Sequence, residues 1–251
     1  MPDPDMETSR CFLKDTIRKT IDFSRTGQSR GLKPPPLEKP CSPDARRVEL
    51  PGADQWPSVE PVDLISAIRN RESRRRFGRK PLSLEELSFL LWATQGVRKR
   101  LDEATALRTV PSAGCRHALE TYLGIFRVEG LDVGVYRYLP LEHQLVFEFS
   151  EERLSEEFAH AAFGQTFVGK SAVTFVWTTI PYRMEWRYDL AAHKVIAIDA
   201  GHVCQNLYLA CEAIGAGTCA VGAYDQQAMD RLLRVDGTDE FVIYLAPVGK
   251  V

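Results

Sequence analysis

The segment AVTFVWTTI, residues 172–180, restricts the fold of this chain more than any other stretch. Its β-branched and aromatic residues follow one another without the polar alternation of a half-exposed strand. Such a run is typical of a strand that is buried on both faces. We therefore expect residues 172–180 to form a strand in the centre of a sheet.

Helical and extended patterns are interspersed on both sides of this segment. Pro61 is typical of a helix start, and the helix that follows it is expected to end near Glu72 or Ser73. Ser83 and Glu86 form a capping box for a second helix, which Gly96 ends. The order does not match a regular βαβ alternation, so the predicted class is α+β, with one mostly antiparallel sheet flanked by helices. The other expected elements are helices at 153–171, 197–217 (C-capped by Gly215 or Gly217) and 229–235, and strands at 121–126, 134–149 (a pair with a turn near Pro140 and Glu142) and 240–249.

Residues 1–60 differ from the rest of the chain. Residues 10–27 have the pattern of a short helix, and the stretch that follows them is rich in proline and irregular. It has the character of an extended arm that wraps a body or a partner subunit, or of a loose leader, and the apolar Leu50 and Trp56 favour wrapping. We therefore divide the chain into an arm, residues 1–60, and one domain, residues 61–251.

Composition and charge exclude several classes of function. The 251 residues carry a formal net charge of −2, without the large positive excess that is typical of nucleic-acid-binding proteins. The sequence has no run of about 18 apolar residues, so no membrane span is expected, and its N-terminus lacks the apolar core of a secretory signal. The six cysteines form no CxxC pair, which favours buried thiols and a reducing cytoplasm. The five histidines are scattered, and no metal site is predicted.

Three short stretches are the candidates for chemistry. The first, RESRRRF at residues 71–77, is either a solvated or nucleic-acid-binding face or an anion pocket for one phosphate, because arginine offers forked donors that suit phosphate oxygens. The second contains the turn PSAG at residues 111–114, which by itself is a common turn. The third, AIGAGTCAVGAYDQ at residues 213–226, follows a helix, so it does not fit a dinucleotide-binding loop.

The order and spacing of these stretches resemble the FMN-dependent nitroreductase family, and more closely its SagB-type dehydrogenase branch. The resemblance covers about residues 60–251. It rests on Arg71, Ser73 and Arg75, on PSAG at 111–114, on WRYDLAAHKVIAIDAGHVCQNLYLA at 186–210, and on GAGTCAVGAYD at 215–225. It implies a nitroreductase-like fold and a domain-swapped homodimer that binds FMN at its interface.

The resemblance also implies roles for individual residues. Arg71, Ser73 and Arg75 would hold the FMN phosphate, while Arg74 and Arg76 point away. The PSAG turn would lie along the flavin ring of the partner subunit, and the third stretch would back the ring near its N5 edge. The implied cofactor-binding residues are Arg71, Ser73, Arg75, Arg108 (to the ribityl chain or the substrate), Pro111, Ser112, Ala113, Gly114, Cys219, Ala220, Val221, Gly222, Ala223 and Lys250 (an additional phosphate contact).

Two positions depart from the pattern of relatives. Many other nitroreductases carry a Glu-Gly pair where this chain has Gly222 and Ala223, so the backbone donor is kept and a carboxylate is lost. Azole-forming SagB-type enzymes carry a Lys-Tyr pair where this chain has Arg187 and Tyr188. Arginine does not act as a general base, which argues against azoline oxidation. As candidate catalytic residues, Tyr188 can transfer a proton and Arg187 can bind an anionic substrate; the alternative is a surface pair without a role.

The resulting hypothesis is a homodimeric FMN oxidoreductase that acts on a small molecule. Hydride would pass through FMN from NAD(P)H or an organic donor to a nitroaromatic, a quinone or a peptide-derived ring, and the sequence has no fingerprint that selects NADH or NADPH. Because the lysine of the Lys-Tyr pair is absent, a flavin-binding scaffold subunit without turnover is the second hypothesis. A module that binds nucleic acid or another anionic partner through its arginines is the third.

Overall fold

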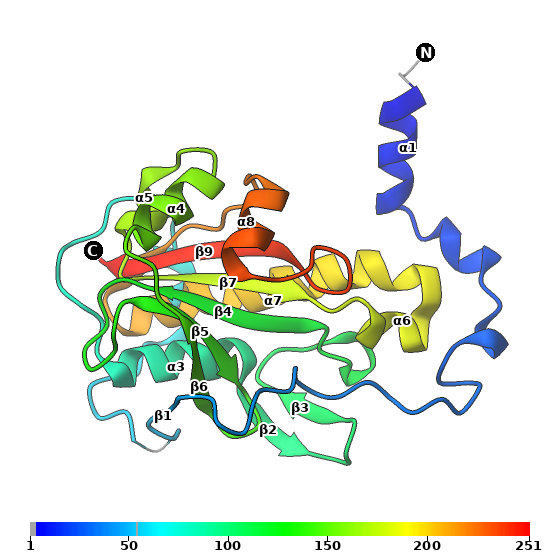
Figure 1. The fold of residues 1–251 in the computed structure, drawn as a ribbon, viewed down its shortest axis with the longest axis horizontal. Coiled ribbons are helices and arrows are strands. Elements are labelled where there is room, and N and C mark those ends of the chain that lie inside the picture. Colours follow the sequence, from blue (N-terminus) through cyan, green and yellow to red (C-terminus); the bar gives the residue numbers. More distant parts are fainter. Residues whose placement is uncertain (1–3, 54) are drawn as a thin grey trace.

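The computed structural model describes residues 4–53 and 55–251, and the parts of the predicted arm at residues 1–3 and 54 lie outside the described residues (Figure 1). A seven-stranded sheet forms the centre, with the order β1-β6-β5-β4-β7-β9-β8 and antiparallel pairing between all neighbours. The predicted α+β class with a mostly antiparallel sheet is confirmed. The strands are β1 (Arg47–Glu49), β4 (Leu119–Ile125), β5 (Gly134–Leu139), β6 (Gln144–Phe149), β7 (Val173–Thr179), β8 (Ala216–Thr218) and β9 (Phe241–Lys250).

Strand β7 lies in the middle of this sheet, as the β-branched run predicts. It pairs with β4 on one side and β9 on the other, and all of its residues are buried. Its side chains alternate between two cores: Phe175 and Trp177 belong to one, and Val176 belongs to the other. A strand with a core on each side carries mostly apolar residues, and the three buried threonines of β7, Thr174, Thr178 and Thr179, have hydrogen-bond partners for their hydroxyl groups.

Helices cover the two faces of the sheet in separate groups (Figure 1). The long helices α3 and α7 contribute to the core that contains Trp177, and α4, α5 and α8 contribute to the core that contains Val176. A two-stranded hairpin, β2 (Val97–Arg100) with β3 (Ala106–Arg108), lies outside the main sheet. The helices are α1 (Pro4–Leu13), α2 (Leu64–Asn70), α3 (Leu84–Gln95), α4 (Leu154–Ala161), α5 (Thr166–Lys170), α6 (Tyr182–Tyr188), α7 (Ala192–Ala213) and α8 (Gln226–Leu233). None of the described helices combines the length and the apolar character needed to cross a membrane.

Local signals explain several helix boundaries. The predicted capping box of α3 is present, because Ser83 Oγ accepts from the N–H of Glu86 at 3.1 Å and Glu86 Oε2 accepts from the N–H of Ser83 at 2.9 Å. Helix α7 begins at Ala192 and ends at Ala213, so it starts earlier than predicted. Gly217 does not cap it, since this residue lies in β8 and pairs with Gly249.

Helix α6 and the strands β1, β2, β3 and β8 were not predicted from the sequence. Strand β1 lies in the arm that was expected to be irregular, and β8 occupies residues that the sequence assigned to a helix end. The predicted helix at 10–27 is α1 followed by two 3₁₀ turns, Thr16–Thr20 and Phe23–Arg25, and the predicted element at 153–171 is two short helices. In each case short-range pattern is weak and contacts with distant residues decide the conformation.

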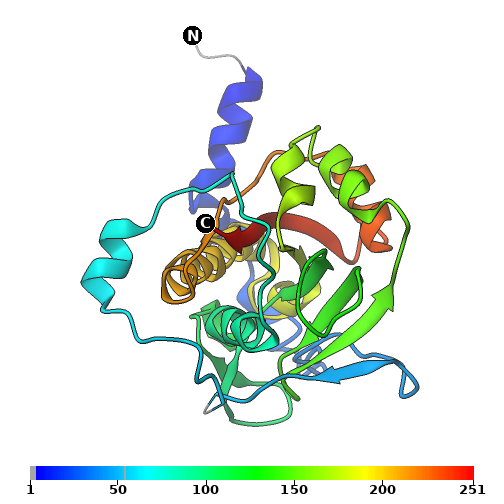
Figure 2. The same cartoon turned by 90° about the vertical axis from the view of Figure 1, so that its left-hand side faces the viewer.

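Helix α1 projects away from the body of the molecule, and the later part of the N-terminal segment runs along the body before α2 (Figure 1). Leu37 and Leu50 are buried, and β1 extends the edge of the main sheet by pairing with β6. Trp56 packs on α3, with its ring centroid 5.4 Å from that of Phe89. Helix α2, cyan in Figure 2, stands out from the body to one side, where it lies next to the end of α7.

Candidate functional site

The arginine-rich segment that follows α2 lies against the short edge strand β8. Ser73 forms a parallel bridge with Thr218, and the N–H of Arg74 donates to the Thr218 carbonyl at 2.8 Å. The close approach requires a glycine in β8, because a Cβ on Gly217 would lie 2.4 Å from Cγ of Arg74. The first and third stretches of the sequence are therefore neighbours in space.

Tyr208 on α7 joins these two stretches through its hydroxyl group. Its Oη lies 2.8 Å from Ser73 Oγ and accepts from the N–H of Ala220 at 2.8 Å. The Arg71 guanidinium lies 5.2 Å from the centre of the Tyr208 ring. Tyr208 lies within the stretch 186–210 but is not among the predicted site residues, since a tyrosine on an amphipathic helix is usually a core residue.

Two of the predicted phosphate-binding arginines have no acidic partner within salt-bridge distance in the described part of the chain. Arg71 contacts the Tyr208 ring, and the exposed Arg75 lies 6.0 Å from the centre of the Phe167 ring. By contrast, Arg74 pairs with Glu72 at 2.7 Å. A hollow of about 540 Å³ opens here, and its lining residues are Ser73, Arg74, Arg75, Arg76, Phe77, Gly78 and Val251. The segment therefore offers uncompensated positive charge at an open hollow.

Arg76 and Lys250 differ in position from the expectations for them. Arg76 lines the same hollow as Arg75, although it is predicted to point away. The ammonium group of Lys250 contacts the carboxylate of Glu86 and the carbonyl of Ile214, and only 13% of its side chain is exposed. The charge of Lys250 is thus already paired, and it ties β9 to the first turn of α3.

The PSAG turn and the Arg187–Tyr188 pair lie together at another place. Ser112 Oγ accepts from the N–H of His117 at 3.0 Å, and Gly114 has a φ of +59°. A Cβ on Gly114 would lie 2.6 Å from Tyr188 Oη and 2.8 Å from Arg187 Nε. The glycine is therefore needed both for the backbone conformation and for this contact. The structure brings the predicted flavin-facing turn against the predicted catalytic pair.

Asp199 on α7 lies behind the PSAG turn. It is buried, and burial raises the pKa of its carboxyl group, while hydrogen bonds from the Ser112 hydroxyl and the N–H of Ala113 act in the opposite direction. Asp199 thus places a buried carboxyl group of α7 beside the turn. It was not among the predicted site residues, and its position in the middle of a helical pattern gave no signal.

Arg108 lies in the interior rather than at an open surface. It donates to Gln95 Oε1 at 2.9 Å and to the Leu37 carbonyl at 2.8 Å, and burial lowers its pKa to about 10. The neighbouring His117 is also buried, and burial together with the charge of Arg108 lowers its pKa to about 3. His117 is therefore neutral near pH 7.

The stretch from Cys219 to Ala223 leaves β8 and crosses to β9. Cys219 and Val221 are buried, whereas Gly222 and Ala223 are exposed. Val221 is held by a backbone pair with Leu245, in which its N–H donates at 2.8 Å. The described residues contain no group of three or more His, Cys, Asp and Glu side chains arranged to hold a metal ion.

The two places are separated along α7 within one chain. Tyr208 marks the arginine-rich hollow, and Asp199 marks the PSAG turn. Nine residues of helix separate them, which corresponds to about 14 Å at the α-helical rise. Within one chain, the two parts of the predicted site therefore lie beside different positions of α7.

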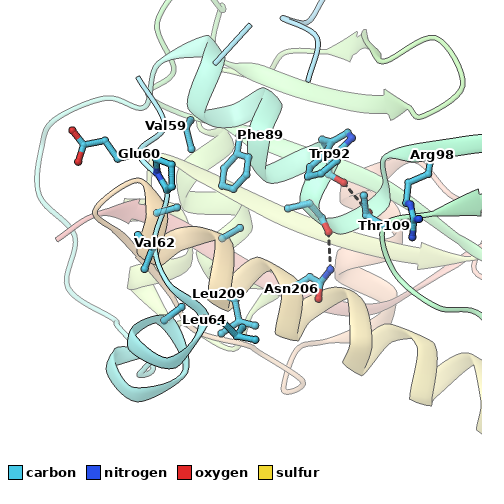
Figure 3. A pocket seen from close by; sticks show the side chains of 15 residues that line it. Val59, Glu60, Val62, Leu64, Phe89, Trp92, Arg98, Thr109, Asn206 and Leu209 are labelled. Carbon is cyan, nitrogen blue, oxygen red and sulfur yellow. Dashed lines mark hydrogen bonds between the residues drawn. The ribbon is translucent and has the colours of Figure 1, made fainter. Parts of the chain in front are cut away.

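A third surface feature is an apolar groove of about 670 Å³ between α3, α7 and the segment that leads into α2 (Figure 3). Phe89 and Trp92 of α3 and Leu209 of α7 line it, and the side-chain amide of Asn206 donates to the Ala93 carbonyl at 2.8 Å. The outer face of α2 is also apolar and exposed, through the side chains of Leu64, Ile65 and Ile68. This face has no cover among the described residues.

Comparison with known proteins identifies the family. The model of the nitroreductase family matches residues 68–250. This chain belongs to the nitroreductase family. The Methanocaldococcus jannaschii protein named Putative nitroreductase MJ1384 is 32% identical over 196 residues, which covers 78% of this chain and 95% of that protein.

Solved structures agree with this assignment. The solved structure of a putative nitroreductase from Ralstonia eutropha JMP134 matches with a TM-score of 0.68 and 27% identity. The match covers 88% of this chain and 95% of the Ralstonia chain. A chain of the E. coli microcin synthetase McbBCD complex has a TM-score of 0.60 and 21% identity, over 78% of this chain and 76% of that chain, which shows a shared fold. The predicted nitroreductase-like fold is confirmed. Members of this family are oxidoreductases that typically bind a flavin.

Proposed function

We propose that this nitroreductase is an FMN-dependent oxidoreductase of the SagB-like type. Hydride would pass through the flavin between NAD(P)H or an organic donor and an acceptor such as a nitroaromatic, a quinone or a peptide-derived ring. The observation that carries the proposal is the position of Arg71 and Arg75, which lack acidic partners in the described chain and lie beside β8 and the small-residue segment after it. Family membership supports the oxidoreductase class.

Ser73 and Arg75 at the hollow, together with Arg71 beside Tyr208, fit a phosphate monoester. Such a group carries nearly two negative charges and three acceptor oxygens. Arg71 and Arg75 supply forked donors, and the Ser73 hydroxyl supplies one more. Because Tyr208 Oη accepts from the N–H of Ala220, its own proton is available for Ser73 Oγ, which leaves the Ser73 proton for a phosphate oxygen. We leave Lys250 out of this set because it is engaged with Glu86.

We propose that the site is completed by a second copy of the chain. In one protomer, Tyr208 beside the arginine-rich segment and Asp199 beside the PSAG turn are about 14 Å apart along α7. The exposed apolar face of α2 and the groove beside α7 form a surface on which a second copy can pack. A two-fold pairing across α7 would bring residues 111–114 of the partner towards the hollow, as the resemblance to the family implies.

The chain's own residues would act on the substrate from the PSAG side. Bound FMN supplies hydride transfer, and the protein supplies orientation and proton transfer. Arg187 keeps its charge and binds or orients the substrate, since a guanidinium does not serve as a base. Tyr188 Oη, at the Gly114 turn, is the group that delivers or accepts a proton. Gly114 lets both side chains approach the backbone of the turn.

An absorbance spectrum of the purified protein tests this proposal. We expect the bands of oxidised flavin, their loss on anaerobic addition of NADH or NADPH, and their return when a quinone or nitroaromatic is added. Bands that no donor bleaches would instead support the flavin-binding scaffold, an alternative motivated by arginine at position 187. A colourless protein that shows no affinity for added FMN would contradict the proposal.

A further inference from the structure

The N-terminal arm makes a specific contact with the helix that carries Arg187 and Tyr188. Residues 26–32 fold into a compact turn in which the N–H of Arg30 donates to the Thr26 carbonyl at 3.0 Å and the N–H of Leu32 donates to the Gly27 carbonyl at 2.9 Å. This 26–32 turn passes beside α6, which Figure 1 shows on the same side of the molecule as the blue N-terminal segment. Nothing in the family site described above includes this turn.

Two hydrogen bonds join the 26–32 turn to Trp186 of α6. The N–H of Gln28 donates to the Trp186 carbonyl at 2.9 Å, and Trp186 Nε1 donates to the Leu32 carbonyl at 3.2 Å. Trp186 is therefore held through both its backbone and its side chain. The carbonyl that Gln28 engages is the one directly before Arg187, so this bond lies next to the candidate catalytic pair.

Gly27 sets how closely the turn approaches the indole ring. A Cβ at this position would lie 2.4 Å from Cδ1 and 3.0 Å from Nε1 of Trp186. The first distance is shorter than a carbon–carbon contact permits, so any side chain at residue 27 has to displace the ring. The ring has little room to move, because it is buried and the Arg116 guanidinium lies 4.9 Å from its centre.

Helix α6 needs such external support. It has seven residues, which is too short for stability in isolation. Its C-cap residue, Asp189, has a φ of +50°, a conformation that non-glycine residues rarely adopt. On the inner side, Met184 and Arg183 are buried in the body. On the arm side, the bonds from Gln28 and to Leu32 are the contacts that fix the last turn.

We propose that the 26–32 turn is a clamp that positions Arg187 and Tyr188 against the Gly114 turn, with Gly27 and Trp186 as its positioning residues. The connection is direct: Gly27 contacts the Trp186 ring, and the two residues that follow Trp186 contact Gly114. Their relevance to catalysis rests on the function proposed above. The positional effect itself does not, because it is measurable on the folded chain without any substrate.

Hydrogen–deuterium exchange of Gly27→Ala tests the positional effect. We expect amides in 183–189 and in 115–117 to exchange about tenfold faster than in the unmodified protein, since overpacking shifts α6 and frees the Gly114 turn. The amides at 115–117 are informative because Cys115 and His117 donate to Ser112. Gly52→Ala is the matched control in the same arm, because its Cβ would meet only Gln55 Oε1 at 4.0 Å. Unchanged exchange in both regions of Gly27→Ala would overturn the clamp.

Kinetics test the consequence for catalysis. In Gly27→Ala we expect kcat/KM for a nitroaromatic acceptor to fall about tenfold or more, while flavin content and the rate of flavin reduction by NAD(P)H stay unchanged, because misplacement by about 1 Å affects the step that uses Arg187 and Tyr188. In a Trp186→Ala background the ring that clashes with the added Cβ is absent, so adding Gly27→Ala should cause little further loss. Equal additive losses in both backgrounds would show that the effect is not transmitted through Trp186, and would overturn the proposal.

The single variant Trp186→Phe tests the clamp if Gly27→Ala does not fold. It removes the donor to the Leu32 carbonyl and keeps an aromatic ring. We expect faster exchange at 183–189 with normal flavin content, and wild-type exchange together with wild-type kinetics would contradict the clamp. If the unmodified protein binds no flavin, the proposed function fails, whereas the exchange experiment still decides whether the clamp exists.

Discussion

Arginines occur in two contrasting settings in this molecule. Arg137 and Arg183 are buried, and both reach the carboxylate of Glu120, at 3.7 Å and 2.6 Å. Arg71 and Arg75, in the segment after α2, have aromatic rings as neighbours and no acidic partner within the described chain. The same side chain thus has a carboxylate partner at Arg137 and Arg183 in the interior, and none at Arg71 and Arg75 in the segment beside β8.

The contrast separates structural arginines from candidate binding arginines. A buried guanidinium must have a partner, because an unpaired charge in the interior costs several kcal/mol. An exposed guanidinium can remain without one, since water solvates it at little cost. Uncompensated charge that gathers at one hollow is therefore available to a ligand, while the interior arginines maintain the fold. Arg108 has no acidic partner within salt-bridge distance among the described residues, but its burial and its bonds to Gln95 Oε1 and the Leu37 carbonyl place it with the interior arginines.

Removing the shared carboxylate should have the largest effect on stability. Glu120→Gln leaves Arg183 buried without a charged partner and weakens the bond that Glu120 accepts from the N–H of Lys39 at 2.8 Å. We expect the free energy of unfolding to fall by about 3–5 kcal/mol. Chemical denaturation monitored by circular dichroism measures this difference.

Glu151→Gln is the matched control for that measurement. Its partner Arg234 lies at 2.9 Å, but both side chains are largely exposed. An exposed pair of this kind contributes about 0–1 kcal/mol. If Glu120→Gln costs no more than Glu151→Gln, the interior arginines are not held by Glu120 and the distinction between the two settings is wrong.

The double variant Arg71→Gln, Arg75→Gln tests the other setting. We expect the Kd for FMN to rise about 100-fold, equivalent to about 2.7 kcal/mol, because two charge-assisted contacts to the phosphate are lost. Stability should not change, since neither side chain has an acidic partner to lose. Titration of the apoprotein with FMN, followed by flavin fluorescence, measures the affinity.

Arg76→Gln serves as the comparison within the same segment. Arg76 lines the hollow but is predicted to point away from the phosphate. We expect a smaller loss of FMN affinity than for either Arg71→Gln or Arg75→Gln. An equal loss would mean that the alternation of binding and non-binding arginines is wrong, and unchanged affinity in the double variant would remove the hollow from the proposed site.

The sequence predicts the centre of this fold well, because the relevant signals are local. The β-branched run 172–180 forms β7, and the capping box of Ser83 and Glu86 is present. Helix α6 lacks such a signal, since its seven residues are partly aromatic and depend on the bond from Gln28, which is distant in sequence. The β2–β3 hairpin is missed because the exposed, charged residues of β2 show no apolar alternation and β3 has only three residues.

The same distinction between local sequence signals and contacts of the folded chain applies to the candidate site. RESRRRF indicates an anion site by composition alone, and the structure places it against β8 as one neighbourhood with residues 218–220. Nothing in the sequence distinguishes Arg108 from Arg75, because pairing with Gln95 and Leu37 follows only from the folded chain. Sequence reasoning therefore finds residue types that suit a ligand, and tertiary packing decides which of them remain available.

The smallest expected effect concerns the acidic residue Glu38, whose charge acts on the buried Arg108. Glu38 of the arm accepts from the N–H of Leu141 at 3.1 Å, and burial, with a further contribution from the charges of Glu142 and Glu120, raises its pKa to about 7. The folded chain therefore binds this proton more tightly than the unfolded chain, whose ordinary value is 4.5. Its contribution to stability is present below that value and is lost as the pH rises to about 7.

Glu38→Gln imitates the protonated carboxyl group at every pH. At about pH 8 it should raise the free energy of unfolding by about 1 kcal/mol, after allowance for partial solvent screening, and it should flatten the fall in stability between about pH 5 and pH 8. Denaturation curves across this range measure both effects, with the exposed Glu152→Gln as the control. A fall in stability that persists unchanged in Glu38→Gln would assign the pH dependence to groups other than Glu38.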